Sequence, residues 1–393
     1  MIEKNIETLK AYMPNSAEEL TPELVDQAIK DCLVKIDHNL ELLGEEYPTP
    51  ATFSNEYRIM DNTEWTNGFW TGMLWLAYEF TGEEKYKEAA EKNVRSFIHR
   101  IDNLIEVNHH DLGFLYTPSC VSAYKLTGDL KARDAAIKAA KQLASRYQKT
   151  GKFIQAWGEL GALDNYRLIV DCLLNIPLLF WASKETGDKE FSEIAKEHFK
   201  TTVKNAIRPD ASAFHTFYFD PETGEPAYGK TRQGYSDDSA WARGQAWLIY
   251  GIALCNAYYP VDTNVEYFEA VTNYFLNRLP ENFVCYWDLI FDDTSGQPRD
   301  TSAAAIAVCG INQMAKEIPN NETLREYEVW ADRILYNLIT HYTEQKAEGV
   351  IALLNEGVYS WHSGKGVNEG NIWGDYFYLE ALMRKKNNWK MYW

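Results

Sequence analysis

Two aspartates stand where a carboxyl group is suited to acid–base chemistry. Asp171 lies near the middle of a nearly apolar stretch, YRLIVDCLLNIPLLFWA, over residues 166–182. Burying an ionised carboxylate is costly unless it is paired or protonated. Desolvation raises the pKa of such a carboxyl group, which keeps it ready to donate a proton near neutral pH. The alternative is that Asp171 only caps the helix that begins at Cys172.

The second candidate is Asp111, in the segment NHHDLGF over residues 108–114. Two histidines precede it, so we expect a cation or a hydrogen-bond donor to keep Asp111 ionised while burial raises the pKa of Asp171. Two carboxyl groups with separated pKa values are typical of general acid/base catalysis, and of glycosidic bond cleavage in particular. We expect no metal at His109, His110 and Asp111, because adjacent side chains point in different directions and no third ligand is obvious.

Other side chains suit a sugar that carries an acid group. Arg243 and Gln233 offer donors for a substrate carboxylate, the arginine through a two-pronged bond, unless they form a surface ion pair. Trp65, Trp157 and Trp247 are candidate platforms for sugar rings, although a single tryptophan is more often a core residue. The chain shows no glycine-rich phosphate loop, HExxH pattern or GxSxG elbow, so we expect no cofactor.

Composition limits the class of protein. The 393 residues are 46% hydrophobic, enough for a sizeable core, and we predict one domain over residues 1–393. The net charge of −18 disfavours nucleic acid and anionic membranes as partners. No CxxC pair occurs, and we expect no signal peptide because the first residues are polar and acidic; both points favour reduced core cysteines and a cytoplasmic location. The cysteines are Cys32, Cys120, Cys172, Cys255, Cys285 and Cys309.

A repeated helix–turn–helix pattern follows a clear first helix. The first helix is predicted over residues 21–43, with Thr21 as its cap and Gly44 at its end, and a last helix is predicted from about residue 374 to 386. The repeats AYEFTGEEKYKEAA, AYKLTGDLKARDAA and ASKETGDKEFSEIA each end one helix at a Thr-Gly turn and open the next with an acidic residue. The turn glycines, which we expect in the left-handed conformation, are Gly82, Gly128 and Gly187.

Loops rich in Trp, His and Asp connect these hairpins. About six hairpins with such loops at one end favour an all-α fold, an (α/α)6 barrel whose mouth the loops share. The alternative is that each loop is an ordinary capped helix start. Strands are scarce, and residues 213–218 and 283–289 are short strands or loops. The loops span residues 62–70, 108–114, 163–171, 236–247, 298–304 and 369–376.

Taken together, these segments place the chain near a known family. The chain resembles the unsaturated glucuronyl hydrolases of glycoside hydrolase family 88, bacterial enzymes that act on the products of polysaccharide lyases. The resemblance covers nearly the whole chain and rests on NTEWTNGFW, HHDLGF, the Asp171 helix and a spaced set of four residues. That set, with spacings of 18, 10 and 4 positions, is His215, Gln233, Arg243 and Trp247.

The resemblance implies a reaction and a set of roles. Asp171 would be the general acid and base, and Asp111 the second essential carboxylate. The substrate would be a glycosaminoglycan oligosaccharide, such as a chondroitin or hyaluronan disaccharide, whose terminal hexuronic acid carries a 4,5 double bond. The reaction would be hydration of that vinyl ether. The subsite for the unsaturated sugar would be lined by Trp65, His110, Trp157, His215, Gln233, Arg243 and Trp247.

A last motif bears on specificity. Ser360, Ser363 and Lys365 in YSWHSGKG match the Ser-x-x-Ser-x-Lys pattern of family members that favour sulfated substrates. The alternative is a flexible polar loop. Two other functions compete: an unsaturated rhamnogalacturonyl hydrolase would not need this motif, and a non-catalytic carbohydrate-binding toroid would gain nothing from an aspartate in an apolar helix.

Overall fold

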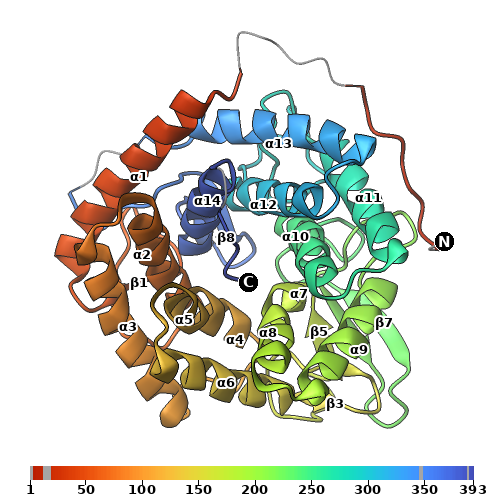
Figure 1. The fold of residues 1–393 in the computed structure, drawn as a ribbon. Coiled ribbons are helices and arrows are strands. Elements are labelled where there is room, and N and C mark those ends of the chain that lie inside the picture. The colour runs from red at the N-terminus through yellow and green to blue at the C-terminus, as the bar shows by residue number, and fades with distance from the viewer. Residues whose placement is uncertain (1–2, 12–18, 345–347, 387–388) are drawn as a thin grey trace.

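The computed structural model describes residues 3–11, 19–344, 348–386 and 389–393, and it is mostly helical. Its helices lie in an inner and an outer layer around a common centre (Figure 1). The outer helices are α1 (Pro22–Leu43), α3 (Glu84–Asp102), α6 (Leu130–Ala144), α9 (Lys189–Asn205), α11 (Asp262–Leu276) and α13 (Glu322–His341). The inner helices are α2 (Asn67–Thr81), α4 (Leu112–Tyr116), the π-helix η2 (Thr117–Val121), α5 (Ser122–Thr127), α7 (Cys172–Asn175), α8 (Pro177–Thr186), α10 (Ala242–Tyr258), α12 (Thr301–Glu317) and α14 (Ile372–Arg384).

The two layers follow from the distribution of apolar residues. The outer helices bury one stripe and expose the opposite face, whereas α10 and α12 are buried on nearly every side. A helix that is apolar all round must be covered on all sides. Accordingly α10 packs against α12, α12 against α14, and α14 against α2, while α7 contacts both α4 and α10.

The predicted turns of the repeat are confirmed. Gly82, Gly128 and Gly187 each end an inner helix in the left-handed conformation, with φ of 70°, 76° and 78°. The acidic residues after two of these turns cap the following outer helices: the side chain of Asp129 accepts from two backbone N–H groups of α6, and that of Asp188 from one of α9. The repeat therefore encodes the alternation of inner and outer helices.

The ends of the helical array also match the sequence pattern. Helix α1 begins after Thr21, whose hydroxyl oxygen accepts from the Leu24 N–H at 3.2 Å, and it ends at Gly44 as predicted. The last helix was expected from about residue 374 to 386, and α14 begins two residues earlier. The predicted ends of the first helix, which rest on the capping residues Thr21 and Gly44, are therefore more accurate than those of the last helix.

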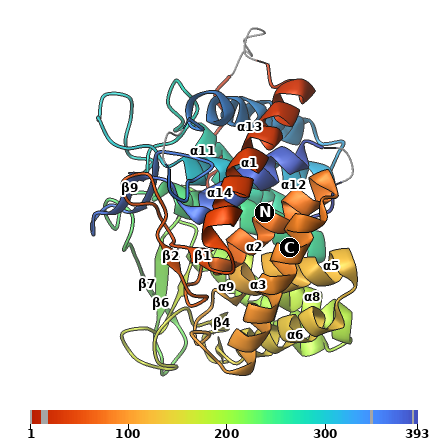
Figure 2. The same ribbon diagram turned by 90° about the vertical axis from the view of Figure 1, so that its left-hand side faces the viewer.

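Short strands project on one side of the helical layers, on the left in Figure 2. Strand β6 overlaps the strand expected at residues 213–218, whereas residues 283–289 form only isolated bridges. All pairings are antiparallel. The sheets are β1–β2 (Tyr47–Pro48, Ile59–Met60), β3–β4 (Tyr147–Gln148, Phe153–Ile154), β5–β6–β7 (Arg167–Ile169, Thr216–Phe219, Pro226–Lys230) and β8–β9 (Gly357–Ser360, Lys365–Glu369).

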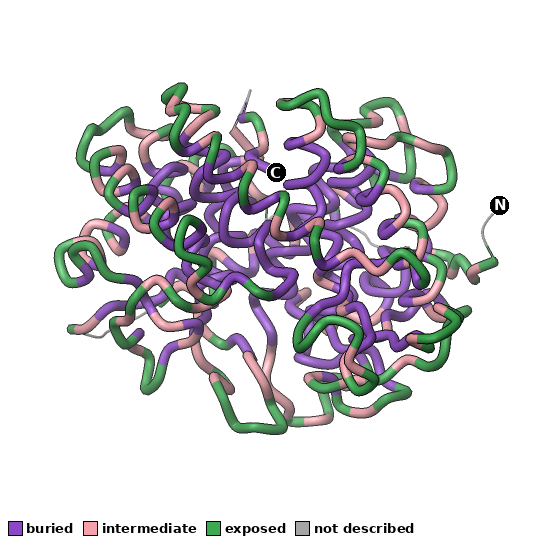
Figure 3. Tube along the Cα trace, turned by 90° about the horizontal axis from the view of Figure 1, so that it is seen from below, coloured by how far each residue is buried: buried purple, intermediate pink, exposed green. Residues whose placement is uncertain are grey.

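The core occupies the middle of the molecule, and exposed residues lie at its edge (Figure 3). All six cysteines are buried and unpaired, as expected. The C-terminal residues reach the centre of the ring (Figure 1), where Trp393 is buried and stacks on Phe377 with ring centroids 5.9 Å apart. Among the described residues, no helix combines the length and the apolar character that crossing a bilayer requires.

Candidate active site

Asp171 stands between strand β5 and the short helix α7. It occupies the N-cap position of α7, but its side chain accepts no capping hydrogen bond. The interpretation of Asp171 as a simple helix cap is therefore wrong. Its Oδ1 atom is buried and lacks a hydrogen-bond partner, while the side chain as a whole is 16% exposed. The carboxyl group is free to act, and solvent or substrate has access to part of it.

Asp111 has the same relation to helix α4. It too occupies an N-cap position without a capping bond from its side chain. Its Oδ1 instead accepts from Asn175 Nδ2 at 3.3 Å, and the Asn175 Oδ1 accepts from the Phe114 N–H at 2.9 Å. Asn175 lies one turn after Asp171, so a single amide links the two helices that carry the carboxyl groups. The sequence shows this i, i+4 spacing, but it gave no reason to assign Asn175 a role.

His110 lies between the two carboxyl groups. Its Nε2 atom is 3.2 Å from Asp111 Oδ1 and 3.5 Å from Asp171 Oδ1. Neither ring nitrogen has a hydrogen bond of good geometry, although both are buried. Unsatisfied buried polar groups are rare in proteins and mark sites where a ligand or a proton is handled. The structure thus brings Asp111, His110 and Asp171 into one cluster.

Burial controls the protonation of this cluster. It raises the pKa of Asp171, against the charge of Arg243, and it raises the pKa of Asp111, to which the charge of Asp171 adds. Burial lowers the pKa of His110 well below its ordinary value and that of His109 to about 3, so both rings are neutral. The expectation that a cation or a hydrogen-bond donor keeps Asp111 ionised is therefore wrong: the rings carry no charge, and the hydrogen bond from Asn175 lowers the pKa of Asp111 less than burial raises it. Each carboxylate disfavours ionisation of the other, so the pair holds a proton at higher pH than an isolated carboxyl group does.

The same three residues, His110, Asp111 and Asp171, are also the candidate ligands for a metal ion. Ligand atoms of His110, Asp111 and Asp171 lie within 4.8 Å of one another, close enough to surround a cation. The argument that no third ligand is available was therefore wrong, because Asp171 supplies one. Carboxylates that retain a proton are nevertheless poor ligands, since metal binding requires their ionised forms.

His215 and Gln233 approach from the β5–β6–β7 sheet and the loop that follows it. His215 Nδ1 accepts from the backbone N–H groups of Arg232 at 2.9 Å and Gln233 at 3.2 Å. The proton of the neutral ring is therefore on Nε2. Burial, with the charge of Arg243, lowers the pKa of His215 to about 3. The Gln233 Oε1 accepts from Arg243 Nη2 at 2.6 Å, which leaves its amide nitrogen as the donor.

Arg243 is buried in the first turn of α10 and is not part of a surface ion pair, since it is 2% exposed. Its Nη1 donates to Asp300 Oδ2 and to the carbonyl of Val358, both at 2.6 Å. Its Nη2 donates to Gln233 and to the carbonyl of Tyr359 at 2.8 Å. Both terminal nitrogens of Arg243 thus donate their hydrogen bonds within the protein. A bidentate bond to a substrate carboxylate would have to replace some of these hydrogen bonds.

The three tryptophans have different surroundings. Trp65 is half-buried, stacks on Trp373 with centroids 5.4 Å apart, and donates from Nε1 to the Tyr359 hydroxyl at 3.1 Å. Trp157 is 38% exposed and lies parallel to the His109 ring at 4.4 Å. Trp247 does not fit the prediction of an exposed platform: it is 1% exposed and packs against Phe114, so it supports the site from within the core.

Ser360, Ser363 and Lys365 lie on the β8–β9 hairpin. Ser363 donates from its hydroxyl to the carbonyl of Ser360 at 3.3 Å, and the Lys365 ammonium lies 4.3 Å from the centroid of the Tyr359 ring. Arg243 holds the same strand through the carbonyls of Val358 and Tyr359. The motif is therefore attached to Arg243 through strand β8, although Ser363 and Lys365 themselves are exposed.

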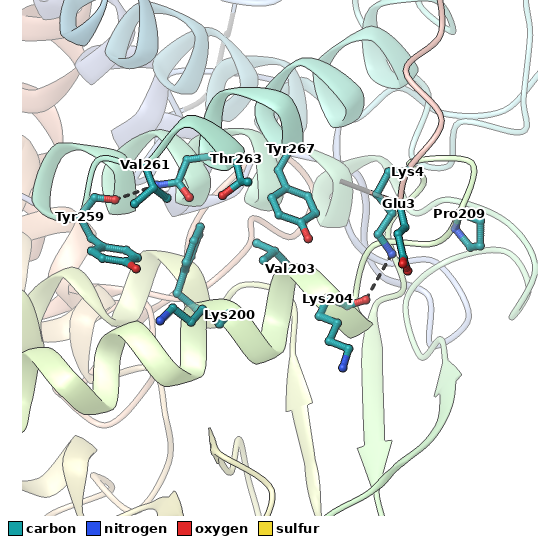
Figure 4. Close-up of a pocket in the computed structure, with 12 residues that line it drawn as sticks. Glu3, Lys4, Lys200, Val203, Lys204, Pro209, Tyr259, Val261, Thr263 and Tyr267 are labelled. Carbon is teal, nitrogen blue, oxygen red and sulfur yellow. Dashed lines mark hydrogen bonds between the residues drawn. The ribbon is translucent and has the colours of Figure 1, made fainter. Parts of the chain in front are cut away.

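A groove of about 570 Å³ lies elsewhere, between α9 and α11 beneath the N-terminal residues (Figure 4). Lys4 Nζ donates to the carbonyl of Lys204 at 3.2 Å, and the Lys200 ammonium lies 5.5 Å from the centroid of the Tyr259 ring. The lining includes none of the residues that the sequence singled out for chemistry. The groove therefore offers no competing location for the reaction.

Comparisons with known proteins show the family of the chain. The family model "Glycosyl Hydrolase Family 88" matches residues 47–377. The chain is 56% identical to an unsaturated chondroitin disaccharide hydrolase of Streptococcus agalactiae, over 99% of this chain and 98% of that protein. It is 57% identical to one of Streptococcus pneumoniae, over 95% of each.

Solved structures show the same fold. The crystal structure of the unsaturated glucuronyl hydrolase from S. agalactiae superposes with a TM-score of 0.94 at 55% identity, covering 99% of this chain and all of that one. A mutant of that enzyme, complexed with the sulfated disaccharide dGlcA-GalNAc6S, superposes with a TM-score of 0.88 at 52% identity, covering 99% of each chain.

The close approach of α4 and α7 gives a first prediction. A Cβ atom at Gly113 would lie 2.6 Å from the Asn175 carbonyl oxygen, so Gly113→Ala must push the two helices apart. We expect kcat on an unsaturated disaccharide to fall by about tenfold or more, because small displacements of catalytic groups are costly. The control Gly82→Ala strains a left-handed turn by about 1–2 kcal/mol without touching the site. Equal activity losses in both variants would show that Gly113 matters only for stability.

Proposed function

The chain belongs to glycosyl hydrolase family 88, and from that premise we propose that it is an unsaturated chondroitin disaccharide hydrolase. Its substrates are disaccharides that a polysaccharide lyase leaves with a 4,5-unsaturated hexuronic acid at the non-reducing end. The observation that carries the proposal is the buried pair Asp111 and Asp171, which face each other across His110 and cap nothing.

Asp171 is the general acid and base in the proposed reaction. Its carboxyl group gives a proton to C4 of the vinyl ether, and the positive charge that develops at C5 is shared with the ring oxygen. The resulting carboxylate then takes a proton from water as the water oxygen bonds to C5. The product is a hemiketal, whose opening expels the partner sugar. The overall change is the addition of one water molecule, with Asp171 returned to its protonated form.

The remaining residues bind and orient the sugar. Asp111 is the second carboxylate, and its hydrogen bond from Asn175 fixes its position beside Asp171. Gln233 and Arg243 would hold the sugar carboxylate, Gln233 through its amide N–H groups and Arg243 mainly through its charge. The other residues of the proposed subsite are Trp65, Trp157, His110 and His215, with Trp247 as support beneath them.

We propose that the fold is a single (α/α)6 barrel over residues 1–393. The succession of contacts among the inner helices and the outer layer of amphipathic helices support this interpretation. The starts of the inner helices carry Asp111, Asp171 and Arg243, so the loops before them form one end of the barrel. A barrel of this kind places the chemistry at a single mouth.

Removal of the acid gives the second prediction. Asp171→Asn keeps the size of the side chain but leaves no acidic proton, so kcat should fall by at least about a hundredfold. The assay follows the loss of ultraviolet absorbance of the conjugated double bond, with a chelator present. Asp188→Asn, which changes an aspartate that caps a remote helix, should keep near-normal activity. Near-normal turnover by Asp171→Asn would refute the assignment.

The pH dependence gives a third prediction. Turnover needs a proton on Asp171, and burial raises the pKa of both Asp171 and Asp111, so the protonated pair persists above the ordinary range of carboxyl groups and is lost as pH rises through the raised values. We expect the alkaline limb of the kcat/KM profile to lie well above pH 4, roughly the value for an unperturbed aspartate. An alkaline limb near that value would mean that Asp171 titrates as an exposed carboxyl group.

Preference for sulfated disaccharides is the fourth prediction. Ser363→Gly and Lys365→Ala each remove a donor suited to a sulfate oxygen. They should each cost about 1–3 kcal/mol in kcat/KM on a sulfated substrate and leave the unsulfated one nearly unchanged. Lys131→Ala, on the exposed face of α6, controls for the loss of one positive charge. Equal losses on both substrates would show that the hairpin residues are only structural.

A further inference from the structure

A buried ion pair lies behind the residues assigned to the site. Arg243 Nη1 and Asp300 Oδ2 are 2.6 Å apart, and their side chains are 2% and 0% exposed. Arg243 stands in the first turn of α10, where the positive end of the helix dipole disfavours a cation. A buried charge in that position needs a counter-ion, and Asp300 is the carboxylate that contacts it.

Through this cation, Asp300 is connected to the β8–β9 hairpin. The other donors of Arg243 hold the carbonyls of Val358 and Tyr359, which are successive residues of β8, and the side chain of Gln233. The guanidinium also lies 4.4 Å from the ring centroid of Trp241. One side chain therefore ties the hairpin to the loop that carries Gln233.

The other oxygen of Asp300 faces helix α12. Asp300 Oδ1 accepts from the Ser302 N–H at 3.2 Å, the Ala303 N–H at 3.4 Å and the Ser302 hydroxyl at 2.5 Å. Ser302 Oγ in turn accepts from Trp373 Nε1 at 3.0 Å, and Trp373 stacks on Trp65. Asp300 therefore links three parts of the structure: the inner helix α12, the stacked rings of Trp373 and Trp65, and the guanidinium of Arg243, which we call the Arg243 clamp.

We propose that Asp300 is a positioning residue, which fixes the β8–β9 hairpin through Arg243 and so sets the preference for sulfated substrates. Asp300 is fully buried and touches no substrate itself. The hairpin carries Ser360, Ser363 and Lys365, so a shift of the Val358–Tyr359 backbone moves the proposed sulfate donors with it. The specificity part rests on the function proposed above, whereas the anchoring of the hairpin does not.

Hydrogen–deuterium exchange of Asp300→Asn tests the anchoring. The variant keeps an acceptor for the α12 cap but loses the charge opposite Arg243. Amide exchange within residues 357–369 should accelerate by about tenfold or more, because local opening becomes easier. The matched control is Asp129→Asn, since Asp129 also caps its helix with two backbone bonds but lies on the outer helix α6. Unchanged hairpin exchange in Asp300→Asn would overturn the proposal.

A second variant keeps the test decisive if Asp300→Asn does not fold. Arg243→Lys retains a positive charge beside Asp300 but cannot span both Val358 and Tyr359, because an ammonium lacks the guanidinium fork. Its hairpin amides should exchange faster than those of the unchanged protein. Slow exchange like that of the unchanged protein would show that the hairpin is held independently of the clamp.

Kinetics separate the specificity role from the proposed function. In Asp300→Asn we expect KM for a 6-sulfated unsaturated disaccharide to rise by about tenfold, with KM for the unsulfated one and both kcat values changed by less than about threefold. Equal rises in both KM values, or a fall in kcat alone, would overturn the specificity role. If the unchanged protein turns over neither substrate, the proposed function fails, and the exchange experiment still decides about Asp300.

Discussion

The desolvation of two carboxyl groups that share one neutral histidine is the constraint on which the site depends. Burial raises the pKa of both Asp111 and Asp171, although part of the Asp171 side chain stays exposed, and the ring of His110 brings no charge to offset either shift. The nearby cation Arg243 is paired with Asp300, and its charge lowers the pKa of Asp171 less than burial raises it. A proton that would leave an exposed aspartate is therefore retained here, and a retained proton is what an acid catalyst needs near neutral pH.

The position of the two carboxyl groups depends on how closely the backbones of helices α4 and α7 pack. Helices α4 and α7 approach so closely that a Cβ atom at Gly113 would collide with the backbone of Asn175. The amide of Asn175 then bonds to both helices. The distance between the two carboxyl groups is set by helix packing rather than by attraction between them, which suits groups that repel each other when both are ionised.

The ends of the helices could be predicted from the sequence, because they are encoded by capping residues close to them in the chain. Thr21, Gly44 and the glycines of the repeat mark helix ends within a few residues, and those ends are where the sequence placed them. The partner of Arg243 was not predictable in this way, because Asp300 lies 57 positions further along the chain. The ionisation of Asp111 was misjudged for a related reason, since burial of this segment depends on residues that are distant in sequence, such as Trp157 against His109.

The structure distinguishes the candidate carboxylates from ordinary capping aspartates by where their oxygens point. Asp129, Asp188 and Asp300 stand at helix starts and spend at least one oxygen on backbone N–H groups. Asp111 and Asp171 stand at equivalent positions and spend none on capping. A capping bond is worth about 1 kcal/mol, and burying a carboxyl group without it costs more still. The absence of capping bonds at two adjoining helix starts therefore supports the proposed acid–base role of Asp111 and Asp171, and the same criterion supports a positioning role for Asp300, which caps and pairs at once.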